Sequence, residues 1–366
     1  MRKTFKYKAK INRVTETNAL RWLDLCRNLY NCALEQRINL YRQHKKSLSM
    51  YDQQNQLPKL KKEILEYKEI DAQCIRNVII RVDKAYKAFF RRIKKGEKAG
   101  FPRFQGKYRY NSFTLEQNSW KLDGKYLTIK KLGVFKLFLS RSIEGDIKEI
   151  IIKHAPTNKW FVTFSCDNVP EIKYPESKES IGIDVGIKSF LTDSKGNVVN
   201  NPHFFVKAQI DLRKKQRKLS RRKKGSNRRN DSRLIVAKAH EKIVNQRLDF
   251  LHKTANKYLE QYAVISIEKL QIKNMVQNSK LSKSISDVGW GTFFNILKYK
   301  AEYAGRKIIE VNPHNTSQIC SGCGTKVPKT LTDRIHCCPE CGLIIDRDFN
   351  SAININVLGQ SIQTIT

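Results

Sequence analysis

The chain has 366 residues and a formal net charge of +37, from 71 lysines and arginines against 34 aspartates and glutamates. This length indicates two or three domains, and the 40% of hydrophobic residues excludes a disordered chain. So much uncompensated positive charge opposes compaction unless a polyanion neutralises it, and we therefore expect a nucleic-acid partner. No apolar stretch follows the charged N-terminus and none approaches the roughly 20 residues of a membrane span, so we expect neither a secretory signal nor a membrane partner.

The nine cysteines are unevenly distributed. Four of them form two Cys-x-x-Cys pairs, and the others are scattered: Cys26, Cys32, Cys74, Cys166 and Cys337. This pattern suits a reducing compartment with one metal site better than a disulfide framework. We therefore expect a cytoplasmic protein.

The first hundred residues are predicted to be mainly helical. Residues 3–14 alternate and predict a strand, whereas residues 15–43 repeat apolar side chains at spacings of three and four, as a helix does. Thr15 or Thr17 can cap the start of this helix. A second amphipathic helix is expected over about 72–95, with an apolar face made of Ile75, Val78, Ile79, Val82, Tyr86, Phe89 and Phe90. We interpret both apolar stripes as helix–helix core.

Residues 101–175 read as short strands and turns. The expected strands cover 112–117, 125–133, 134–140, 147–155 and 159–166. This succession predicts a β-barrel or a small sandwich. The charged stretch 167–180, which contains two prolines, is predicted to be a linker.

A new domain is expected from residue 180, where strands and helices alternate as in an α/β domain. Its strands are expected within 180–186, 189–199 (two strands around a turn), 262–270 and 306–311. Its helices are expected over 206–223, 232–260, 289–305 and 349–358. Gly305 can terminate the third of these helices.

The strongest local motif is a cysteine knuckle. Cys320-x-x-Cys323 and Cys338-x-x-Cys341 are separated by fourteen residues, and four thiolates at such spacings favour tetrahedral zinc, with iron as the minor alternative. Cys337 could replace Cys338, but only Cys338 gives the two-residue spacing to Cys341. Four protein ligands leave no open position, so we expect a structural zinc. Two flanking histidines are not expected to be ligands: His314 and His336.

Acidic residues at element ends form a second candidate site. Asp184 interrupts an apolar strand and Glu268 ends another, and an acid in such a place is costly unless it meets a cation or a partner. Asp346 and Asp348 precede the last expected helix. Three acids from distant elements would bind divalent metal through oxygen, and two Mg²⁺ so held can hydrolyse a phosphodiester. On residue type alone, Asp348 could instead be an N-cap, and Asp184 could pair with a lysine.

Seven stretches, taken in order, resemble one known family. They read "CRNLYNCALEQR", "FPRFQGK", "IGIDVGIKSFLTDS", "ISIEKL", "GWGTFFNILKYKAEYAGR", "VNPHNTSQICSGCG" and "CPECGLIIDRDFNSAININ". They run from residue 26 nearly to the C-terminal end. In these stretches the chain resembles TnpB, the transposon-encoded RNA-guided nuclease related to type V CRISPR effectors.

The resemblance implies a catalytic triad. The family's nuclease is a RuvC-like domain of the RNase H fold with an Asp, Glu, Asp site, which implies Asp184, Glu268 and Asp348 as the Mg²⁺ ligands. The family's final acid precedes x-Asn-Ala-Ala, which here selects Asp348, with Ser351 in place of the first alanine. Because residues two apart on a helix do not share a face, Asp346 is not expected to enter the same site.

The resemblance also implies a multidomain fold with α+β and α/β parts. The implied domains are a β-barrel wedge domain (1–14 and 101–176), a helical recognition domain (15–100), a RuvC-like nuclease domain (177–313 and 343–366) and an inserted zinc ribbon that binds target nucleic acid (314–342). One zinc and two Mg²⁺ are the implied cofactors. The implied partners are a transposon-encoded guide RNA and double-stranded DNA with a short adjacent motif. A monomer is favoured, acting at the nucleoid in a prokaryotic cytoplasm, and nuclear localisation stays open because related eukaryotic proteins exist.

A basic run carries the expected backbone contacts. Eleven of the residues 213–229 are lysine or arginine. A run of this kind is usually a solvated face, but at this density like charges repel at i,i+4, so we expect phosphate contact. The candidate nucleic-acid-binding residues are Arg213, Lys214, Arg217, Arg221, Arg222 and Arg228, with Arg334 beside the knuckle. Arg347 lies close enough in sequence to join Arg334.

Three other functions stay open at this point. A small CRISPR effector of related origin would have a repeat array beside its gene. A guide-free transposase would act on DNA without RNA. A guided binder that does not cut would be marked by degraded acids, whereas all three acids are present.

Overall fold

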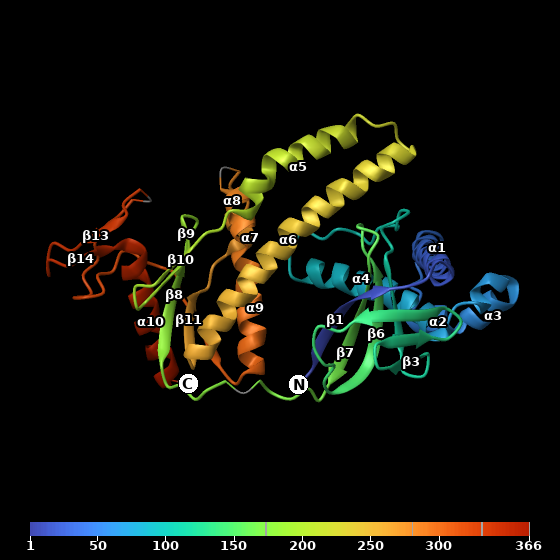
Figure 1. Cartoon of the computed structure of the whole chain (residues 1–366), viewed down its shortest axis with the longest axis horizontal. Helices are drawn as coiled ribbons and strands as arrows, with labels where there is room; N and C mark the ends of the chain where they lie inside the picture. The colour runs from blue at the N-terminus through green and yellow to red at the C-terminus, as the bar shows by residue number, and fades with distance from the viewer. Residues whose placement is uncertain (173, 280, 331, 366) are drawn as a thin grey trace. The chain divides into compact units, whose positions relative to one another are not determined.

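The computed structural model describes residues 1–172, 174–279, 281–330 and 332–365, apart from the side chain of residue 365. By contacts the chain divides into two compact units, Met1–Pro170 and Glu171–Thr366. Figure 1 shows the strands and helices of each unit, coloured from blue at the N-terminus to red at the C-terminus. Among the described residues, no helix has the combined length and apolarity needed to cross a membrane.

The first unit is built on a seven-stranded antiparallel sheet in the order β2-β6-β7-β1-β5-β4-β3. Its strands are β1 (Lys3–Lys10), β2 (Ser112–Glu116), β3 (Trp120–Asp123), β4 (Tyr126–Ile129), β5 (Gly133–Phe138), β6 (Asp146–His154) and β7 (Trp160–Asp167). The strands expected between 112 and 166 are confirmed, and β3 is an additional strand that the sequence analysis missed. The alternation in β1 buries Phe5, Tyr7 and Ala9 on one face, as period-2 geometry requires.

The first helix begins earlier than expected, so the strand predicted for 3–14 ends at Lys10. The N-cap of the helix is Asn12, whose Oδ1 accepts a hydrogen bond from the Thr15 amide at 2.8 Å. The expectation that Thr15 or Thr17 caps the helix is therefore wrong. Asparagine is as good an N-cap as threonine or better, and here it stands one residue before the helix.

The helices of the first unit lie between β1 and β2 in the chain. They are α1 (Arg13–His44), α2 (Met50–Asn55), α3 (Leu57–Glu63) and α4 (Ala72–Lys94), with a 3₁₀ turn at Leu65–Lys68. The helices at 15–43 and 72–95 are confirmed. The apolar face of α4 is buried from Ile75 to Val82, but Phe90 is 59% exposed, so its assignment to the core is wrong.

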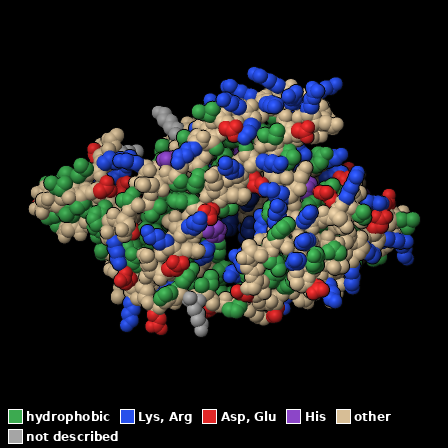
Figure 2. Space-filling view, in the orientation of Figure 1, with side chains coloured by type: hydrophobic (Ala, Val, Ile, Leu, Met, Phe, Trp, Pro, Cys, Tyr) green, Lys and Arg blue, Asp and Glu red, His purple; other side chains and the backbone are tan. Residues whose placement is uncertain are grey.

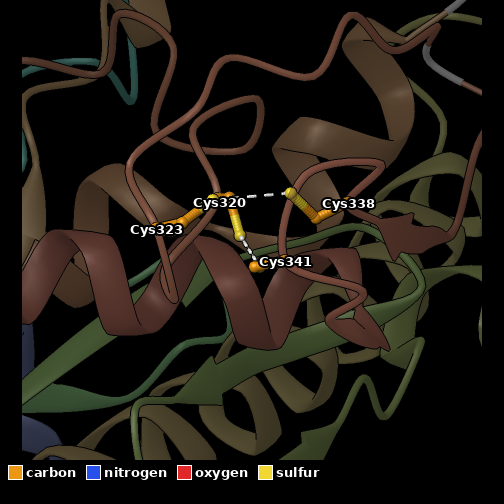
Figure 3. Close-up of side chains that lie close together, drawn as sticks. All are labelled: Cys320, Cys323, Cys338 and Cys341. Atoms are coloured by element: carbon orange, nitrogen blue, oxygen red, sulfur yellow. Dashed lines mark hydrogen bonds between the residues drawn. The ribbon is translucent and has the colours of Figure 1, made fainter.

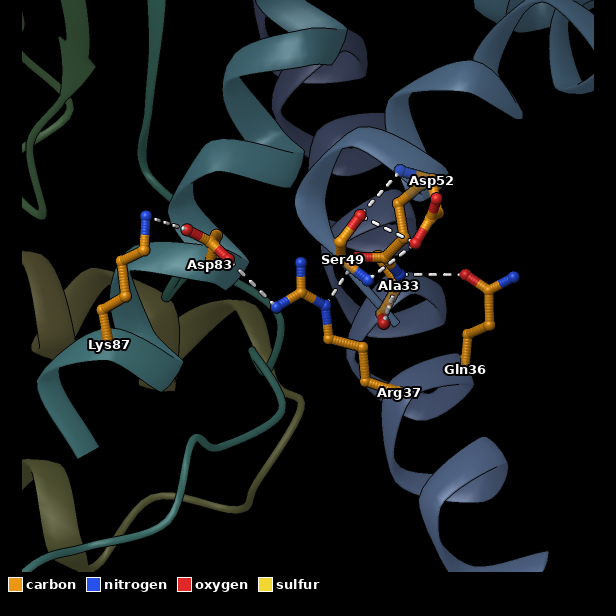
Figure 4. Close-up of polar contacts among 8 residues, drawn as sticks. Ala33, Gln36, Arg37, Ser49, Asp52, Asp83 and Lys87 are labelled. Atoms are coloured by element: carbon orange, nitrogen blue, oxygen red, sulfur yellow. Dashed lines mark hydrogen bonds and ion pairs between the residues drawn. The ribbon is translucent and has the colours of Figure 1, made fainter. Parts of the chain in front are cut away.

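One buried arginine ties three of these helices together (Figure 4). Arg37 of α1 donates from Nε to Gln53 of α2 at 2.7 Å and from Nη1 to Asp83 of α4 at 3.3 Å. Burial raises the pKa of Asp83, but hydrogen bonds from Lys87 and Arg37 outweigh it and hold that pKa below its ordinary value. The network fixes how α1, α2 and α4 lie against one another.

The second unit contains a five-stranded sheet in the order β10-β9-β8-β11-β12. Its strands are β8 (Ser180–Val185), β9 (Ser189–Asp193), β10 (Val198–Asn200), β11 (Val264–Glu268) and β12 (Lys307–Val311). β10, β9 and β8 pair antiparallel, whereas β8, β11 and β12 run parallel. All the strands expected between 180 and 311 are confirmed.

The helices of the second unit are α5 (Phe204–Ser220), α6 (Asn227–Gln261), α7 (Ile272–Met275), α8 (Ser282–Val288), α9 (Trp290–Tyr303) and α10 (Arg347–Ile365). The expected helices are confirmed, although α6 starts five residues earlier than predicted and α10 runs well beyond 349–358. A short hairpin, β13 (Ile335–Cys337) with β14 (Ile344–Asp346), precedes α10 directly.

A buried ion pair holds the base of the α5–α6 hairpin. The Asp287 carboxylate of α8 accepts from the Arg247 guanidinium of α6 at 2.9 Å and from the backbone amide of Phe205 in α5 at 3.1 Å. Asp287 is buried, so these two charge-assisted bonds replace its hydration. The two long helices α5 and α6 of Figure 1 are thereby fixed to α8 in the second unit.

Candidate metal and nucleic-acid sites

Two of the predicted acids lie side by side at one edge of the sheet. Strands β8 and β11 are parallel neighbours in which Ile183 is the register partner of Ile267. Asp184 and Glu268 each follow these partners by one residue, so both carboxylates leave adjacent strands at their carboxyl ends. The sheet pairing therefore brings together two acids that are 84 residues apart in the chain, since 268 − 184 = 84.

Helix α10 covers the face of the sheet that carries these acids. A Cβ atom on Gly182 would lie 2.2 Å from the carbonyl oxygen of Ala352, and one on Gly359 would lie 1.9 Å from the hydroxyl of Ser266. Because side chains alternate along a strand, Gly182 shares its face with Asp184, and Ser266 shares its face with Glu268. Two glycines thus let α10 approach the sheet closely on the acidic face.

The third acid stands in the first turn of α10. Asp348 is partly buried, and its Oδ2 lies 3.9 Å from the position of a Cβ on Gly186, just beyond the end of β8. Its Oδ1 accepts hydrogen bonds from the Arg347 guanidinium at 3.0 and 3.2 Å. Asp346 is the N-cap instead, because its Oδ1 accepts from the backbone amides of Asp348 and Phe349 at 2.8 and 3.1 Å. The reading of Asp348 as an N-cap is therefore wrong.

The charges of the other two acids act on Asp184. Burial raises the pKa of Asp184 well above its ordinary value, and the charges of Glu268 and Asp348 raise it further, against a smaller lowering by Arg347. Burial also raises the pKa of Glu268. Burial, and at Asp184 the like charge of its neighbours, both disfavour the ionised carboxylate. A cation that binds here would favour the ionised form.

A series of two hydrogen bonds connects Glu268 through Thr316 to Asn354 of α10. The Thr316 hydroxyl donates to Glu268 Oε1 at 2.6 Å and partly offsets the rise of the Glu268 pKa. The backbone carbonyl of Thr316 in turn accepts from Asn354 Nδ2 of α10 at 2.8 Å. All three side chains are buried, so each hydrogen bond replaces water that the site excludes.

A second asparagine, one turn earlier on α10, binds the entrance of the knuckle. Asn350 Oδ1 accepts from the Ser321 amide at 2.9 Å, and its Nδ2 donates to the Ile319 carbonyl at 2.8 Å. Asn354 Nδ2 also donates to the Ile319 carbonyl, at 2.7 Å. We call Asn350 and Asn354 the asparagine clamp. Residues 316–321 are held to the helix that carries Asp348 by this clamp.

The four cysteines of the knuckle come together as predicted (Figure 3). Their sulfur atoms all lie within 4.8 Å of one another, with 3.6 Å between Cys320 and Cys341 and 3.5 Å between Cys323 and Cys338. Tetrahedral zinc with ligand bonds near 2.3 Å needs sulfurs about 3.8 Å apart. The donor set and its spacing therefore fit a zinc ion with four thiolates. By contrast, the three carboxylates do not meet the same 4.8 Å spacing among the described residues.

Two thiols of the knuckle have pKa values shifted in opposite directions. Hydrogen bonds from Thr325 lower the pKa of Cys323 to about 6. A backbone hydrogen bond at Leu343 lowers the pKa of Cys341, but its hydrogen bonds to the neighbouring thiols outweigh this and raise that pKa to about 12. The pKa of Cys323 thus favours the thiolate, whereas Cys341 would need a bound dication to ionise.

The residues next to the ligands lie outside the group. Cys337 is exposed on β13, where alternation turns it away from the buried Cys338. His314 is exposed, whereas His336 is buried with Nδ1 against the Lys329 ammonium. Cys338, and not Cys337, lies with the other three cysteines.

The predicted nucleic-acid contacts lie mostly on α5 and its connection to α6, where Figure 2 shows lysine and arginine side chains gathered. An open groove of about 530 Å³ is lined by Lys214, Arg217, Lys218, Arg221 and Arg222. Five of the predicted nucleic-acid-binding residues are exposed, and three of them also line this groove. The exposed residues are Arg213, Lys214, Arg217, Arg221 and Arg228. The site therefore offers a row of cations to a polyanion.

Two arginines near these candidates have structural contacts. Arg229 donates from Nη1 to the carbonyls of Leu219 and Arg222 at 2.9 and 2.8 Å, which closes the connection between α5 and α6. Arg334 is exposed, and its carbonyl accepts from the Arg347 amide at 2.8 Å. Arg334 and Arg347 are thus brought together at the junction of the knuckle with α10.

Comparison with known proteins gives matches along nearly the whole chain. Residues 163–279 match a family described as "Probable transposase" (OrfB_IS605), and residues 290–355 match one described as "Cas12f1-like, TNB domain". A candidate RNA-guided DNA endonuclease of Streptomyces pristinaespiralis is 28% identical over 370 residues, which cover 98% of this chain and 90% of that protein. The candidate RNA-guided DNA endonuclease InsQ of Escherichia coli K12 is 28% identical over 378 residues, covering 98% and 92%.

The fold is also shared with a solved structure. The mini-RNA-guided endonuclease CRISPR-Cas phi3 matches with a TM-score of 0.52 at 10% identity, covering 98% of this chain and 92% of that one. The likeness is one of fold. In sequence, the chain is therefore related over nearly its whole length to RNA-guided DNA endonucleases and TnpB-like proteins.

Proposed function

We propose that the protein is a transposon-encoded, RNA-guided DNA endonuclease. The observation that carries the proposal is that Asp184 and Glu268 leave neighbouring parallel strands at the same edge of the sheet, where the charge of the α10 acid Asp348 also acts on Asp184. This arrangement occurs in a chain whose relatives over 98% of its length are named as candidate RNA-guided DNA endonucleases. The combination favours phosphodiester hydrolysis directed by a guide.

The three acids are proposed to hold two Mg²⁺. Carboxylate oxygens suit Mg²⁺, and a cation would favour the ionised form of Asp184, whose pKa is raised by burial and by the charges of its neighbours. When bound, such ions supply an activated water and stabilise the leaving oxygen. Asp184 and Glu268 offer oxygens from rigid strands, Thr316 fixes the orientation of Glu268, and Arg347 compensates the charge of Asp348 until a cation does so.

Thr316→Val tests the positioning of Glu268. Valine keeps the shape of threonine but removes the hydroxyl, so Glu268 loses its hydrogen bond. We expect the Mg²⁺ concentration needed for half-maximal cleavage to rise by about 10- to 100-fold, the usual cost of losing such an outer partner. Calorimetric titration with Mn²⁺ should show the same loss of affinity. Thr17→Val, on the exposed face of α1, is the control, and an unchanged metal requirement in Thr316→Val would contradict the assignment.

The knuckle is proposed to hold one structural zinc. The four thiolates would complete its coordination, so no position remains for a water or a substrate. Bound there, zinc would fix the segment between β12 and α10. The asparagine clamp would pass that order to the helix carrying Asp348.

The family assigns roles to the parts of the fold, and we propose them here. Support for a RuvC-like domain of the RNase H fold in 177–313 and 343–366 comes from the mixed sheet, whose antiparallel β10-β9-β8 continues into parallel β11 and β12. The insertion 314–342 would be the zinc ribbon that binds target nucleic acid. Residues 1–14 and 101–176 would form the β-barrel wedge, with 15–100 as the recognition domain.

The basic α5–α6 hairpin (Phe204–Gln261) is proposed to hold the backbone of the guide RNA or of its heteroduplex with DNA. Sequence would be read by guide pairing and by a short motif beside the target. Phosphate contacts make binding depend on salt, with a slope of about 0.7 to 0.9 per contact in a plot of log affinity against log salt.

Arg217→Ala with Arg221→Ala tests this contact. Both residues line the basic groove, and we expect weaker RNA binding and a salt slope reduced by about 1.4 to 1.8. Affinity measured at four salt concentrations gives the slope. Lys59→Ala is the control, because this exposed lysine of α3 already pairs with Glu63. A slope equal to that of the unaltered protein would remove the hairpin from the interface.

The first experiment is purification of the protein from cells that carry its gene with the downstream flank, followed by sequencing of the bound RNA. A discrete RNA extending beyond the element would be expected, and it would direct Mg²⁺-dependent cleavage of a matching DNA. The family description "Probable transposase" favours one alternative, a guide-free enzyme that joins DNA ends. Cleavage or joining by RNA-free protein would support that alternative and overturn the proposal.

A further inference from the structure

A cluster of four aromatic rings lies at the C-terminal end of α4 and the start of the following loop. We call Tyr86, Phe89, Phe90 and Phe101 the ring cluster. Phe101 meets Tyr86 and Phe89 edge-to-face, with centroids 5.6 and 5.3 Å apart. Phe90 stacks on Tyr86 at 6.2 Å and meets Phe89 at 5.2 Å. Phe90 and Phe101 are exposed, whereas Tyr86 and Phe89, which both of them contact, are partly buried.

Two residues of α1, Arg37 and Asn31, hold the ring cluster and the loop that follows it. The Arg37 guanidinium lies over the Tyr86 ring at 5.4 Å and is itself fixed by Gln53 and Asp83, the network of Figure 4. The loop after Phe101 is pinned to α1, because Asn31 and the backbone of Gln105 exchange two hydrogen bonds of 2.7 and 3.0 Å. The rings are therefore presented in a defined arrangement.

The outer rings face solvent in a strongly basic part of the chain. Phe90 is 59% exposed and Phe101 is 48% exposed, and Phe104 follows at 52%. Single exposed apolar side chains are ordinary, but a packed group of rings is not. Residues 84–109 contain ten lysines and arginines and one acid, Glu97. The surface thus combines flat apolar rings with cations.

We propose that the ring cluster stacks with unpaired bases of the guide RNA, an inference that rests on the proposed function and deepens it. Aromatic rings flanked by cations match the two features of a single strand, exposed base faces and phosphates. Paired bases in a duplex offer no free face to a ring. Two other occupants fit the charge less well. A second copy of the chain would bring a surface that is also positively charged, and a different protein would need enough acidic residues to neutralise ten cations.

The test compares the unaltered protein with a Phe90→Leu/Phe101→Leu variant. Leucine keeps an apolar side chain but has no ring to stack on a base. The probe is a mixed-sequence, 20-nucleotide single-stranded RNA without internal pairing, and binding is followed by fluorescence anisotropy over a salt series. We expect at least about fivefold weaker binding with an unchanged salt slope, because rings are lost and charges are kept. Tyr51→Leu, in the same unit and 70% exposed, is the matched control and should bind as the unaltered protein does.

A second measurement uses the unaltered protein and so does not depend on how the variant folds. RNA of the same sequence with 5-iodouracil is irradiated on the protein, and crosslinked peptides are identified by mass spectrometry. We expect crosslinks at Phe90 or Phe101. Crosslinks confined to other parts of the chain would overturn the inference.

The remaining outcomes separate the inference from the function on which it rests. Equal affinity of variant and unaltered protein for the RNA overturns the ring cluster alone and leaves guided cleavage standing. A loss of equal size on duplex RNA excludes base stacking. A loss seen only with single-stranded DNA assigns the surface to DNA and overturns the assignment to RNA. Failure of the unaltered protein to bind any RNA overturns both proposals.

Discussion

Asp184→Asn is expected to reduce DNA cleavage by at least about a hundredfold while the affinity for guide RNA and target DNA stays nearly unchanged. The substitution keeps the shape of the side chain but removes the negative charge of the Asp184 carboxylate, which lies beside Glu268 at the end of β8. Preorganised charge at a reacting centre commonly contributes about 10²–10³ in rate, and here it would also hold the metal. Cleavage should be measured at saturating guide and target, with binding measured separately by filter retention.

The control for this variant is a buried aspartate of the same sheet with a structural role. Asp193 accepts hydrogen bonds from the backbone amides of Lys195 and Asn197, both at 2.9 Å, and from the Tyr258 hydroxyl at 3.0 Å. Asp193→Asn should therefore lower thermal stability but spare the cleavage rate of the folded protein. Loss of DNA binding in Asp184→Asn, or full cleavage by it, would contradict the assignment of the acids.

The second large effect is expected on removal of zinc. Cys338→Ser should abolish zinc binding, because a tetrahedral site loses one of four thiolates. Structural zinc contributes about 10–16 kcal/mol to the folding of small domains, far more than the knuckle can replace with its own packing. We therefore expect the β13–β14 hairpin and residues 316–321 to become disordered. Cleavage should fall with them, because Thr316 no longer orients Glu268.

The neighbouring cysteine provides a matched control for the zinc prediction. Cys337→Ser changes an exposed thiol outside the group and should retain one zinc per chain. Elemental analysis gives the stoichiometry, and hydrogen exchange at the amides of 316–321 reports order independently of activity. Zinc loss in Cys337→Ser instead of Cys338→Ser, or full cleavage by a zinc-free protein, would contradict the structural role.

Much of the fold could be predicted because its signals are local. The alternation in β1, the helical period in α1 and α4 and the glycine after α9 each depend on a few neighbouring residues. The short helices α2 and α3 gave no such signal, since six or seven residues complete barely two turns. Phe90 was misplaced because periodicity identifies a face of a helix but not where the neighbouring elements stop covering it.

The motifs and the family resemblance selected the candidate acids and cysteines, but they did not reveal the residues that orient them. Asp184 and Glu268 could be paired from their positions at strand ends, because parallel strands end at the same edge. Thr316, Asn350 and Asn354 were missed, since their partners are backbone atoms that only the fold brings near. One signal was available: Asn350 and Asn354 are weak helix formers four residues apart in a helix, and such a pair needs a tertiary reason.

Helix α10 has a consequence for the newly made protein. It contributes Asp348 and closes over the face of β8 that carries Asp184, yet 164 residues separate the two acids, since 348 − 184 = 164. At about 5–20 residues per second, a ribosome needs roughly 10–30 s to cover that distance. During this interval the nascent chain completes its α5–α6 hairpin (Phe204–Gln261) but still lacks the helix that carries Asp348. The exposed cations of α5 are therefore present before the group of three acids is complete.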